Sequence, residues 1–251
     1  LTGLGDVVRA DRDKWAINTV VIDPGHGGKD PGCVGWDNIY EKDIVLPIAL
    51  QLADRLRDDL GVHVVLTRDT DRYTSLRTRG RKAINEGGKL FVSIHCNWLK
   101  QTWFSGVETY FLSDALTDEA RRVARLENAS LRFEVDTTGV AADSCCDWGD
   151  VEEIMVGMSS THYLKESQQL AKGVQEELVR SLGTRDLGVH QANFYVMRGT
   201  LGAMPSIMVE VGYLSNPAEA RRLRQKSYQR RVADAIYLAI SEFKRARERG
   251  M

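Results

Sequence analysis

The chain has 251 residues, with 34 Lys and Arg against 35 Asp and Glu, so its formal net charge at pH 7 is -1. Hydrophobic residues make up 43% and charged residues 27% of the chain, values that are typical of a globular protein and argue against a disordered or fibrous chain. Because the two signs of charge are balanced, we expect no sequence-independent binding to nucleic acid phosphates.

No stretch of the sequence approaches the roughly 20 consecutive apolar residues that span a bilayer, so we expect no transmembrane segment. We also find no fixed-period repeat and no Gly/Ser linker, which predicts a single domain over residues 1–251. The first residue is Leu1 rather than Met, so we expect a mature or trimmed piece, in which the absence of a signal peptide says nothing about where the protein acts.

Short β-branched runs bounded by Gly, Asp or Lys predict buried strands at residues 19–23, 62–67, 90–94, 107–112, 193–197 and 207–211. Apolar residues at helical spacing predict helices at residues 44–56, 75–86, 163–182 and 228–243. This alternation predicts an α/β fold with a mostly parallel twisted sheet and helices on both faces. In such folds the binding site lies beyond the strand ends.

The first predicted strand runs into a glycine-rich turn around His26, in residues 22–32 (IDPGHGGKDPG). Glycines let the backbone turn sharply here and expose the imidazole. The nucleotide-binding spacings G-x-G-x-x-G and G-x-x-x-x-G-K-[ST] are both absent, which disfavours a phosphate-binding loop. A tight turn with an incidental histidine is the alternative.

Two further polar residues lie at element ends. Glu41 opens a predicted helix, where a carboxylate commonly just stabilises the helix N-terminus. His95 follows an apolar strand, where a lone histidine is more often a hydrogen-bonded core residue. Taken together, however, His26, Glu41 and His95 match the ligand set of an open catalytic zinc site. Neighbouring strand residues point to opposite faces, so we interpret Cys96, like Cys33, as a packing residue.

Glu210 lies in the motif of residues 204–217 (MPSIMVEVGYLSNP), inside the apolar strand predicted at residues 207–211. Glutamate is rarely buried without a partner, so one interpretation is a structural salt bridge to an arginine. The interpretation that we favour is catalytic, because metal-assisted hydrolysis needs a carboxylate as a proton shuttle beside the activated water.

Six ordered motifs resemble the zinc-dependent N-acetylmuramoyl-L-alanine amidases, catalytic domains that strip stem peptides from peptidoglycan glycan strands. They are residues 22–32, 41–43, 66–71, 75–79, 91–97 and 204–217. The resemblance covers nearly the whole chain and implies that His26, Glu41 and His95 bind Zn²⁺, with Glu210 as the catalytic carboxylate. Cys96 stands where the family usually has a small residue such as Ala, a departure that leaves the ligands unaffected.

The resemblance implies hydrolysis of the amide between N-acetylmuramic acid and the first L-alanine of the stem peptide, in cell-wall remodelling and daughter-cell separation. Asp23, Asn97 and Arg79 lie within the motifs and either orient the ligands or have a plain structural role. Two alternatives stay open: another zinc peptidase or deacetylase acting on the cell wall, and a non-catalytic peptidoglycan-binding module.

A peptidoglycan substrate implies an exported protein of the periplasm or cell envelope. In that setting Cys145 and Cys146 could oxidise, although a bond between adjacent residues is strained.

Residues 113–160 are too many for an ordinary connection between a strand and a helix. Apolar residues among arginines predict an amphipathic helix in residues 120–132. The sequence also resembles the insert of the regulated amidases of Gram-negative division, where a helix lies over the active site until an activator moves it. This resemblance implies that Glu127 is a fourth, inhibitory zinc ligand and that a periplasmic activator protein releases it, with Glu152 and Glu153 as fallback candidates.

Overall fold

The computed structural model describes residues 16–134 and 150–249, with the side chains of the second stretch described from residue 162 onward. Cys145 and Cys146 therefore lie outside the described residues, as do the side chains of Glu152 and Glu153.

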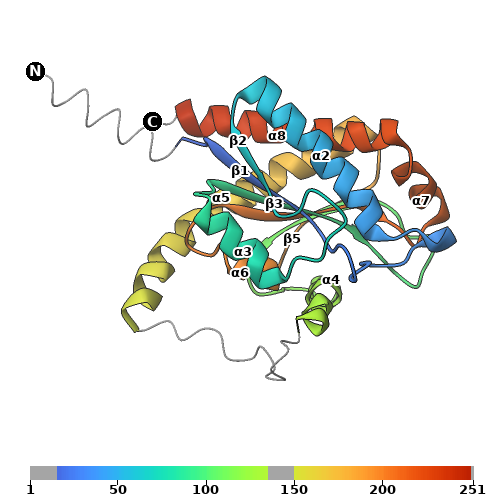
Figure 1. Cartoon of the computed structure of the whole chain (residues 1–251), viewed down its shortest axis with the longest axis horizontal. Helices are drawn as coiled ribbons and strands as arrows, with labels where there is room; N and C mark the ends of the chain where they lie inside the picture. Colours follow the sequence, from blue (N-terminus) through green and yellow to red (C-terminus); the bar gives the residue numbers. More distant parts are fainter. Residues whose placement is uncertain (1–15, 135–149, 250–251) are drawn as a thin grey trace, which may run out of the picture.

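Six strands form one sheet in the described part of the chain, in the order β2-β1-β3-β6-β4-β5 (Figure 1). Their bounds are β1 Thr19–Pro24, β2 His63–Leu66, β3 Leu90–Asn97, β4 Val107–Leu112, β5 Asp186–Ala192 and β6 Ser206–Tyr213. The first four strands in this order are parallel, whereas β4 runs antiparallel to β6 and parallel to β5. The prediction of a mostly parallel sheet is confirmed.

Helices cover both faces of this sheet (Figure 1). One face carries α2 (Glu41–Leu60), α5 (Asp150–Leu182) and α8 (Lys226–Arg249). The other face carries α3 (Leu76–Asn85), α4 (Asp118–Asn128) and α6 (Tyr195–Arg198). The connections hold α7 (Pro217–Leu223) and two 3-10 helices, η1 (Trp36–Asn38) and η2 (Ala129–Phe133). None of the described helices has the length and apolar character of a membrane span.

The core divides into two layers because successive strand residues point to opposite faces. In β1, Val20 and Ile22 belong to the larger cluster, beneath α2 and α8, and Val21 to the smaller cluster on the other side. The smaller layer contains fewer apolar residues, and polar side chains of β1, β3 and β6 replace them toward the C-terminal ends of these strands. This polar end of the smaller layer is where the site forms.

One predicted strand differs from the structure. The predicted strand at residues 193–197 is wrong, because a short turn of helix, α6, buries Val196 and Met197 there. The strand at the sheet edge is instead β5, which begins seven residues before the predicted strand. Most residues of β5 are only half-buried. Short apolar runs do not distinguish strand from buried helix, and an edge strand with Gly188 at φ 95° has a weak β pattern. The helix predicted within residues 120–132 forms as α4, followed by η2.

Candidate active site

The three predicted ligands lie where β1, β3 and α2 meet. His26 follows β1 in a left-handed conformation with φ 55°, which is rare for a residue other than glycine and is found mostly at functional sites. Glu41 is the first residue of α2, and His95 lies on β3. Gly25 allows this close approach, because a Cβ atom there would lie 2.4 Å from Cε1 of His95.

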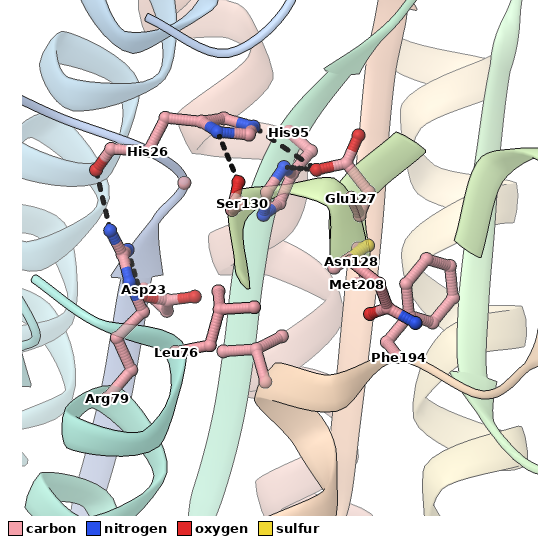
Figure 2. Close-up of a pocket in the computed structure, with 12 residues that line it drawn as sticks. Asp23, His26, Leu76, Arg79, His95, Glu127, Asn128, Ser130, Phe194 and Met208 are labelled. Atoms are coloured by element: carbon pink, nitrogen blue, oxygen red, sulfur yellow. Dashed lines mark hydrogen bonds and ion pairs between the residues drawn. The ribbon is translucent and has the colours of Figure 1, made fainter. Parts of the chain in front are cut away.

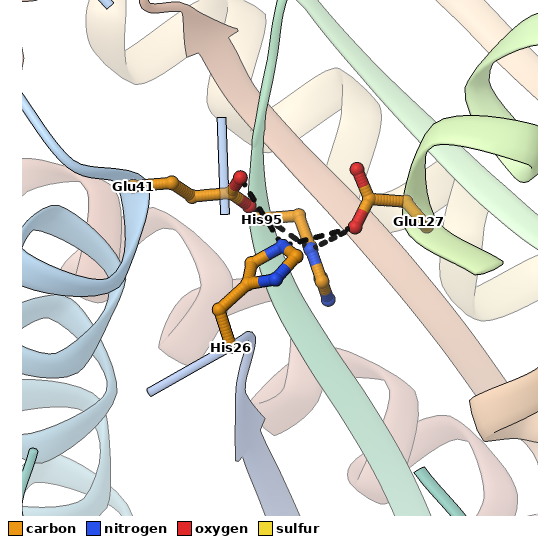
Figure 3. A group of neighbouring side chains, drawn as sticks. All are labelled: His26, Glu41, His95 and Glu127. Atoms are coloured by element: carbon orange, nitrogen blue, oxygen red, sulfur yellow. Dashed lines mark hydrogen bonds and ion pairs between the residues drawn. The ribbon is translucent and has the colours of Figure 1, made fainter. Parts of the chain in front are cut away.

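The structure brings His26, Glu41, His95 and Glu127 together in one buried cluster (Figure 3). One ligand atom from each residue lies within 4.8 Å of the other three. His26 Nε2 is 3.2 Å from Glu41 Oε2, and His95 Nδ1 is 3.0 Å from Glu41 Oε1. In the described part of the chain this is the one group of such residues with the spacing of a metal site.

Glu127 enters the cluster from α4, on the side opposite Glu41 (Figure 3). Its Oε2 atom lies 2.7 Å from His95 Nδ1 and 3.2 Å from His26 Nε2. The carboxylate therefore faces the same two nitrogen atoms as Glu41 does. Only 8% of Glu127 is exposed, although the neighbouring Leu126 is 40% exposed. Glu127 is thus the one buried acidic residue of α4, and its side chain points into the site.

His26 is oriented by a carboxylate that sequence reasoning missed. Its Nδ1 atom donates to Asp30 Oδ2 at 2.9 Å, which leaves Nε2 facing the cluster. Ser130 of η2 donates to the same Asp30 oxygen at 2.7 Å. Asp30 is part of the glycine-rich motif, and its position four residues after His26 was the available signal.

Glu41 is held by the backbones of the two cysteines. Its Oε2 accepts from the Cys33 N–H at 2.9 Å, and its Oε1 accepts from the Cys96 N–H at 3.0 Å. The Cys96 side chain points into the large apolar layer, and Cys33 packs against the same layer. Among the described residues neither thiol belongs to the metal-spaced group, in agreement with their interpretation as packing residues.

Asp23 and Arg79 form a buried ion pair, with Arg79 Nη1 2.7 Å from Asp23 Oδ1 (Figure 2). Burial by itself raises the pKa of Asp23, but the Arg79 guanidinium and the hydrogen bond from the Thr67 hydroxyl together outweigh burial, so the pKa lies below its usual value. Arg79 Nη2 also donates to the His26 carbonyl at 2.6 Å. The pair fixes the strained turn that carries His26.

The carboxylates of the cluster raise the pKa of both imidazoles. Burial by itself lowers the pKa of His26, yet Glu41 raises it well above its usual value. Burial likewise lowers the pKa of His95, but Glu127 and Glu41 outweigh it and raise this pKa to about 10. Such a concentration of anionic oxygen and imidazole nitrogen favours binding of a cation.

Glu210 lies on β6, opposite His95 of β3 and Glu108 of β4 in the strand registers. It is fully buried, and neither carboxylate oxygen has a hydrogen-bond partner in the described part of the chain. The alternative of a structural salt bridge therefore has no partner among the described residues. Burial, followed by the nearby charge of Glu127, raises the pKa of Glu210 well above its usual value.

Glu108 is a second buried glutamate that sequence reasoning missed. Its carboxylate accepts hydrogen bonds from Asn97 Nδ2 at 2.5 Å, from the Tyr213 hydroxyl at 2.7 Å and from the Tyr110 hydroxyl at 2.8 Å. The signal was available, because Glu108 lies within an apolar strand, as Glu210 does. Glu108 accepts three hydrogen bonds, whereas Glu210 accepts none from the described residues. Of these two carboxylates, Glu210 is therefore the one whose oxygens are free to bind another group.

A small cavity of about 10 Å³ adjoins the cluster, about the space of one water molecule (Figure 2). Its walls include His26 and His95 on one side and Glu127, Asn128 and Ser130 of α4 and η2 on the other. A polymeric substrate does not fit into this space while α4 is in place.

Comparisons with known proteins agree with this geometry. The family model described as N-acetylmuramoyl-L-alanine amidase matches residues 20–242. The N-acetylmuramoyl-L-alanine amidase AmiC of Neisseria meningitidis is 33% identical over 227 residues, covering 89% of this chain and 52% of AmiC. This chain therefore spans about half the length of that relative.

Solved structures of similar proteins share the fold. The N-acetylmuramoyl-L-alanine amidase from Clostridium difficile 630 superposes with a TM-score of 0.67 at 29% identity, covering 91% of this chain and 97% of that one. The CwlD amidase from Clostridioides difficile, solved in complex with the GerS lipoprotein, gives a TM-score of 0.66 at 27% identity, with coverage of 91% and 99%. The chain belongs to the N-acetylmuramoyl-L-alanine amidase family and is an amidase catalytic domain.

Proposed function

We propose that this protein hydrolyses the amide bond between N-acetylmuramic acid and the L-alanine of peptidoglycan stem peptides, with Zn²⁺ as its metal. The observation that carries this proposal is the buried cluster of His26, Glu41 and His95 beside an unpaired Glu210. These residues supply both a metal site and a separate base, as metal-assisted hydrolysis requires.

The donor set fits zinc. Two imidazole nitrogens and one carboxylate are the protein ligands of many catalytic zinc sites, and ligands about 2.0–2.1 Å from a tetrahedral ion lie roughly 3.3 Å apart. The separations of 3.2 Å and 3.0 Å between the Glu41 oxygens and the two imidazoles are close to that value. Asp30 and the two cysteine N–H groups orient His26 and Glu41 from outside the cluster, as partners of metal ligands do.

When bound, Zn²⁺ supplies a water molecule of pKa about 7 and polarises the scissile carbonyl. Glu210 acts as the base: one of its carboxylate oxygens accepts the proton of the attacking water and then delivers it to the departing nitrogen of L-alanine. Both Glu210 oxygens are available, since neither accepts a hydrogen bond from the described residues. Burial and the carboxylates around Glu210 raise its proton affinity, as suits a base that works near neutral pH.

The bond that is cut tests this proposal. We expect digestion of purified peptidoglycan to release stem peptides with a free L-alanine amino group, and to leave glycan strands that retain their lactyl carboxylates. Mass spectrometry of the products identifies the bond. Released acetate would indicate a deacetylase, cleavage within the stem would indicate a peptidase, and binding without products would indicate a wall-binding module. Any of these three results contradicts the proposal.

We further propose that the described structure is a resting state in which Glu127 is a fourth, inhibitory ligand. Glu127 Oε2 lies 2.7 Å and 3.2 Å from the two nitrogen atoms that face the cluster. A carboxylate at this position competes with water for the open coordination position of a catalytic zinc site. The cavity of about 10 Å³ is consistent with a site that is closed to substrate.

The segment that carries Glu127 is fastened over the site by hydrogen bonds. Asn128 donates to the Asn193 carbonyl at 3.0 Å and accepts from the Tyr195 N–H at 2.8 Å. Lys29 donates to the Phe133 carbonyl at 2.8 Å, and Ser130 bonds Asp30. Ser130 Oγ also lies 3.3 Å from His26 Nδ1. These contacts support a regulatory role for the segment that carries Glu127, because they fix its carboxylate over the site.

An activator protein that moves α4 would complete this scheme. The similar CwlD amidase has been solved in complex with a lipoprotein, so an amidase of this fold can bind a protein partner. We infer that the present protein acts in the periplasm or cell envelope, where peptidoglycan lies, and that it serves wall remodelling and daughter-cell separation. The role in division follows from the resemblance of its insert to that of the regulated division amidases.

Replacing Glu127 by alanine is expected to raise the basal rate of peptidoglycan hydrolysis by about 10- to 100-fold. Loss of one hydrogen-bonded charged group removes roughly 1.5–3 kcal/mol from the covering conformation, which corresponds to about this change in population. The measurement is release of stem peptides without any added partner.

The matched control is Arg125→Ala on the same helix, because Arg125 is exposed and its Nε donates only to the Arg121 carbonyl. We expect the control to keep the low basal rate. An unchanged rate in both Glu127→Ala and a chain shortened within residues 113–160 would contradict the inhibitory role of Glu127, while leaving the proposed reaction intact.

A further inference from the structure

Exposed aromatic side chains gather in two connections of the described chain. They are Trp36 (42% exposed), Tyr40 (42%), Trp98 (37%) and Trp103 (71%). The first two belong to the connection between β1 and α2, and the last two to the connection between β3 and β4. No other aromatic side chain of residues 16–134 and 162–249 is similarly exposed. Such a concentration of exposed aromatic surface is typical of a binding site.

The same two connections adjoin the residues of the proposed metal site. Tyr40 directly precedes Glu41, and Trp98 follows His95 by three residues. Because consecutive Cα atoms are about 3.8 Å apart, the Trp98 Cα lies within about 11 Å of the His95 Cα. The exposed rings are therefore neighbours of the reaction centre rather than a remote patch.

A short segment after β6 joins the two connections. The Trp36 N–H donates to the Leu214 carbonyl at 2.8 Å, and the Leu214 N–H donates to the Asn97 carbonyl at 2.9 Å. The ring of Trp103 contacts that of Phe104 at 5.7 Å between centroids, and Phe104 contacts Tyr213 at 5.0 Å. Trp103 thus reaches Tyr213 through Phe104, while the backbones of Trp36 and of Asn97, which precedes Trp98, bond Leu214. Tyr213 and Leu214 lie three and four residues beyond Glu210.

Hydrogen bonds and a cation–π contact hold the backbone of these two connections in place, although their tryptophan rings are exposed. The Arg221 guanidinium of α7 lies over the Trp36 ring at 5.2 Å, which places this connection beside α7 (Figure 1). The Gly35 N–H donates to the Ile39 carbonyl at 2.8 Å, and the Leu99 N–H donates to the Ser215 hydroxyl at 3.1 Å. Fixing the backbone in advance lowers the entropy cost of binding, as a dedicated binding surface requires.

We propose that Trp36, Trp98 and Trp103 form an aromatic platform that binds the glycan strand of peptidoglycan through the apolar faces of its N-acetylated sugar rings. The inference rests on the proposed function, because the amide that is cut hangs from a sugar by one lactyl group. A sugar ring must therefore lie beside the cluster during the reaction, and its neighbours along the strand extend over the surrounding surface.

The chemistry of the platform favours a glycan over a protein partner. A sugar ring offers a flat C–H face to an indole and hydroxyl and acetamido groups around its rim. The platform interleaves its rings with polar groups: Lys100 and Gln101 are exposed between Trp98 and Trp103, and Arg221 accompanies Trp36. A stable protein interface instead has a contiguous core depleted of charge.

The experiment measures binding of a peptide-free glycan, the hexamer of N-acetylglucosamine, to the full chain by titration calorimetry. We expect Trp103→Ala and Trp36→Ala each to weaken binding by roughly three- to tenfold, the usual worth of an aromatic ring contact. Leu201→Ala, which truncates an exposed apolar residue outside both connections, is the matched control and should bind as wild type does. In kinetics on intact peptidoglycan, the tryptophan variants should raise KM and keep kcat.

Absence of hexamer binding by the wild-type chain would overturn the platform, as would equal weakening by Leu201→Ala. A wild-type chain that self-associates through Trp103 without binding the hexamer would also overturn it, and would make this surface a contact between two copies. Calorimetry involves no turnover, so the two proposals can fail separately. Trp103-dependent hexamer binding by a chain that cuts no amide would support the platform and refute the proposed reaction.

Discussion

Replacing Glu210 by glutamine is expected to lower the rate of amide hydrolysis by about 10²- to 10⁴-fold, the usual contribution of a positioned general base. Glutamine has nearly the same shape but does not accept a proton at this position. The fold should persist, because both Glu210 oxygens lack hydrogen-bond partners among the described residues and the substitution breaks no contact there. Metal content should also persist, since Glu210 lies outside the metal-spaced group.

The measurement is the single-turnover rate on peptidoglycan together with metal analysis of the same samples, in a Glu127→Ala background so that the site is open. Glu219→Gln is the matched control. Glu219 is also buried, and it accepts the Tyr213 and Gly106 N–H groups through hydrogen bonds of 2.7 Å and 3.1 Å. The control should lose stability and keep its rate. If Glu210→Gln hydrolysed peptidoglycan nearly as fast as the parent, Glu210 would be a structural residue only.

Replacing His95 by alanine is expected to reduce the metal content from one ion per chain to a small fraction, and to abolish activity. In the proposed site His95 supplies one of two nitrogen ligands, and its loss leaves mainly carboxylates, which zinc favours less as a complete set. Treatment of the wild-type chain with a chelator should have the same effect on activity, and added Zn²⁺ should restore it. Elemental analysis and peptide release are measured in parallel.

His63→Ala is the control for this experiment, because His63 is an exposed histidine at the start of β2 and lies outside the cluster. It should keep both the metal and the rate. Wild-type metal content and activity in His95→Ala would rule out the assigned site. Recovery with a different divalent ion and not with Zn²⁺ would keep the site but contradict zinc as the metal.

The elements that carry the proposed metal ligands were predictable because each has a strong local pattern. β1 and β3 are mainly apolar runs ending at a motif, and α2 begins at Glu41, three residues before the apolar helical spacing begins at Ile44. The antiparallel placement of β4 beside β6 was not predictable, because pairing between strands about 100 residues apart depends on the tertiary fold. That pairing places Glu108 opposite Glu210.

The partners of the ligands were harder to foresee than the ligands. Asp30 lies in a recognised motif, yet its bond to His26 depends on the left-handed turn at His26 itself. Ser130 approaches from η2, 100 residues further along the chain than Asp30, and no spacing rule indicates such a contact. The contacts that orient a site are therefore less visible in sequence than the residues that perform its chemistry.

The composition of the buried face of α4 determines how readily this helix can leave the site. Its buried residues are Ala120, Val123, Ala124 and Glu127, whereas α2 buries a row of isoleucine, valine and leucine side chains. Returning one valine and two alanines to water costs roughly 3–5 kcal/mol, at about 0.8 kcal/mol per buried methylene. Release of the hydrogen-bonded Glu127 carboxylate adds roughly 1.5–3 kcal/mol to this cost. Because α4 contacts only the smaller apolar layer, its local detachment leaves the larger core beneath α2 and α8 intact, and the central sheet can stay folded while α4 moves away.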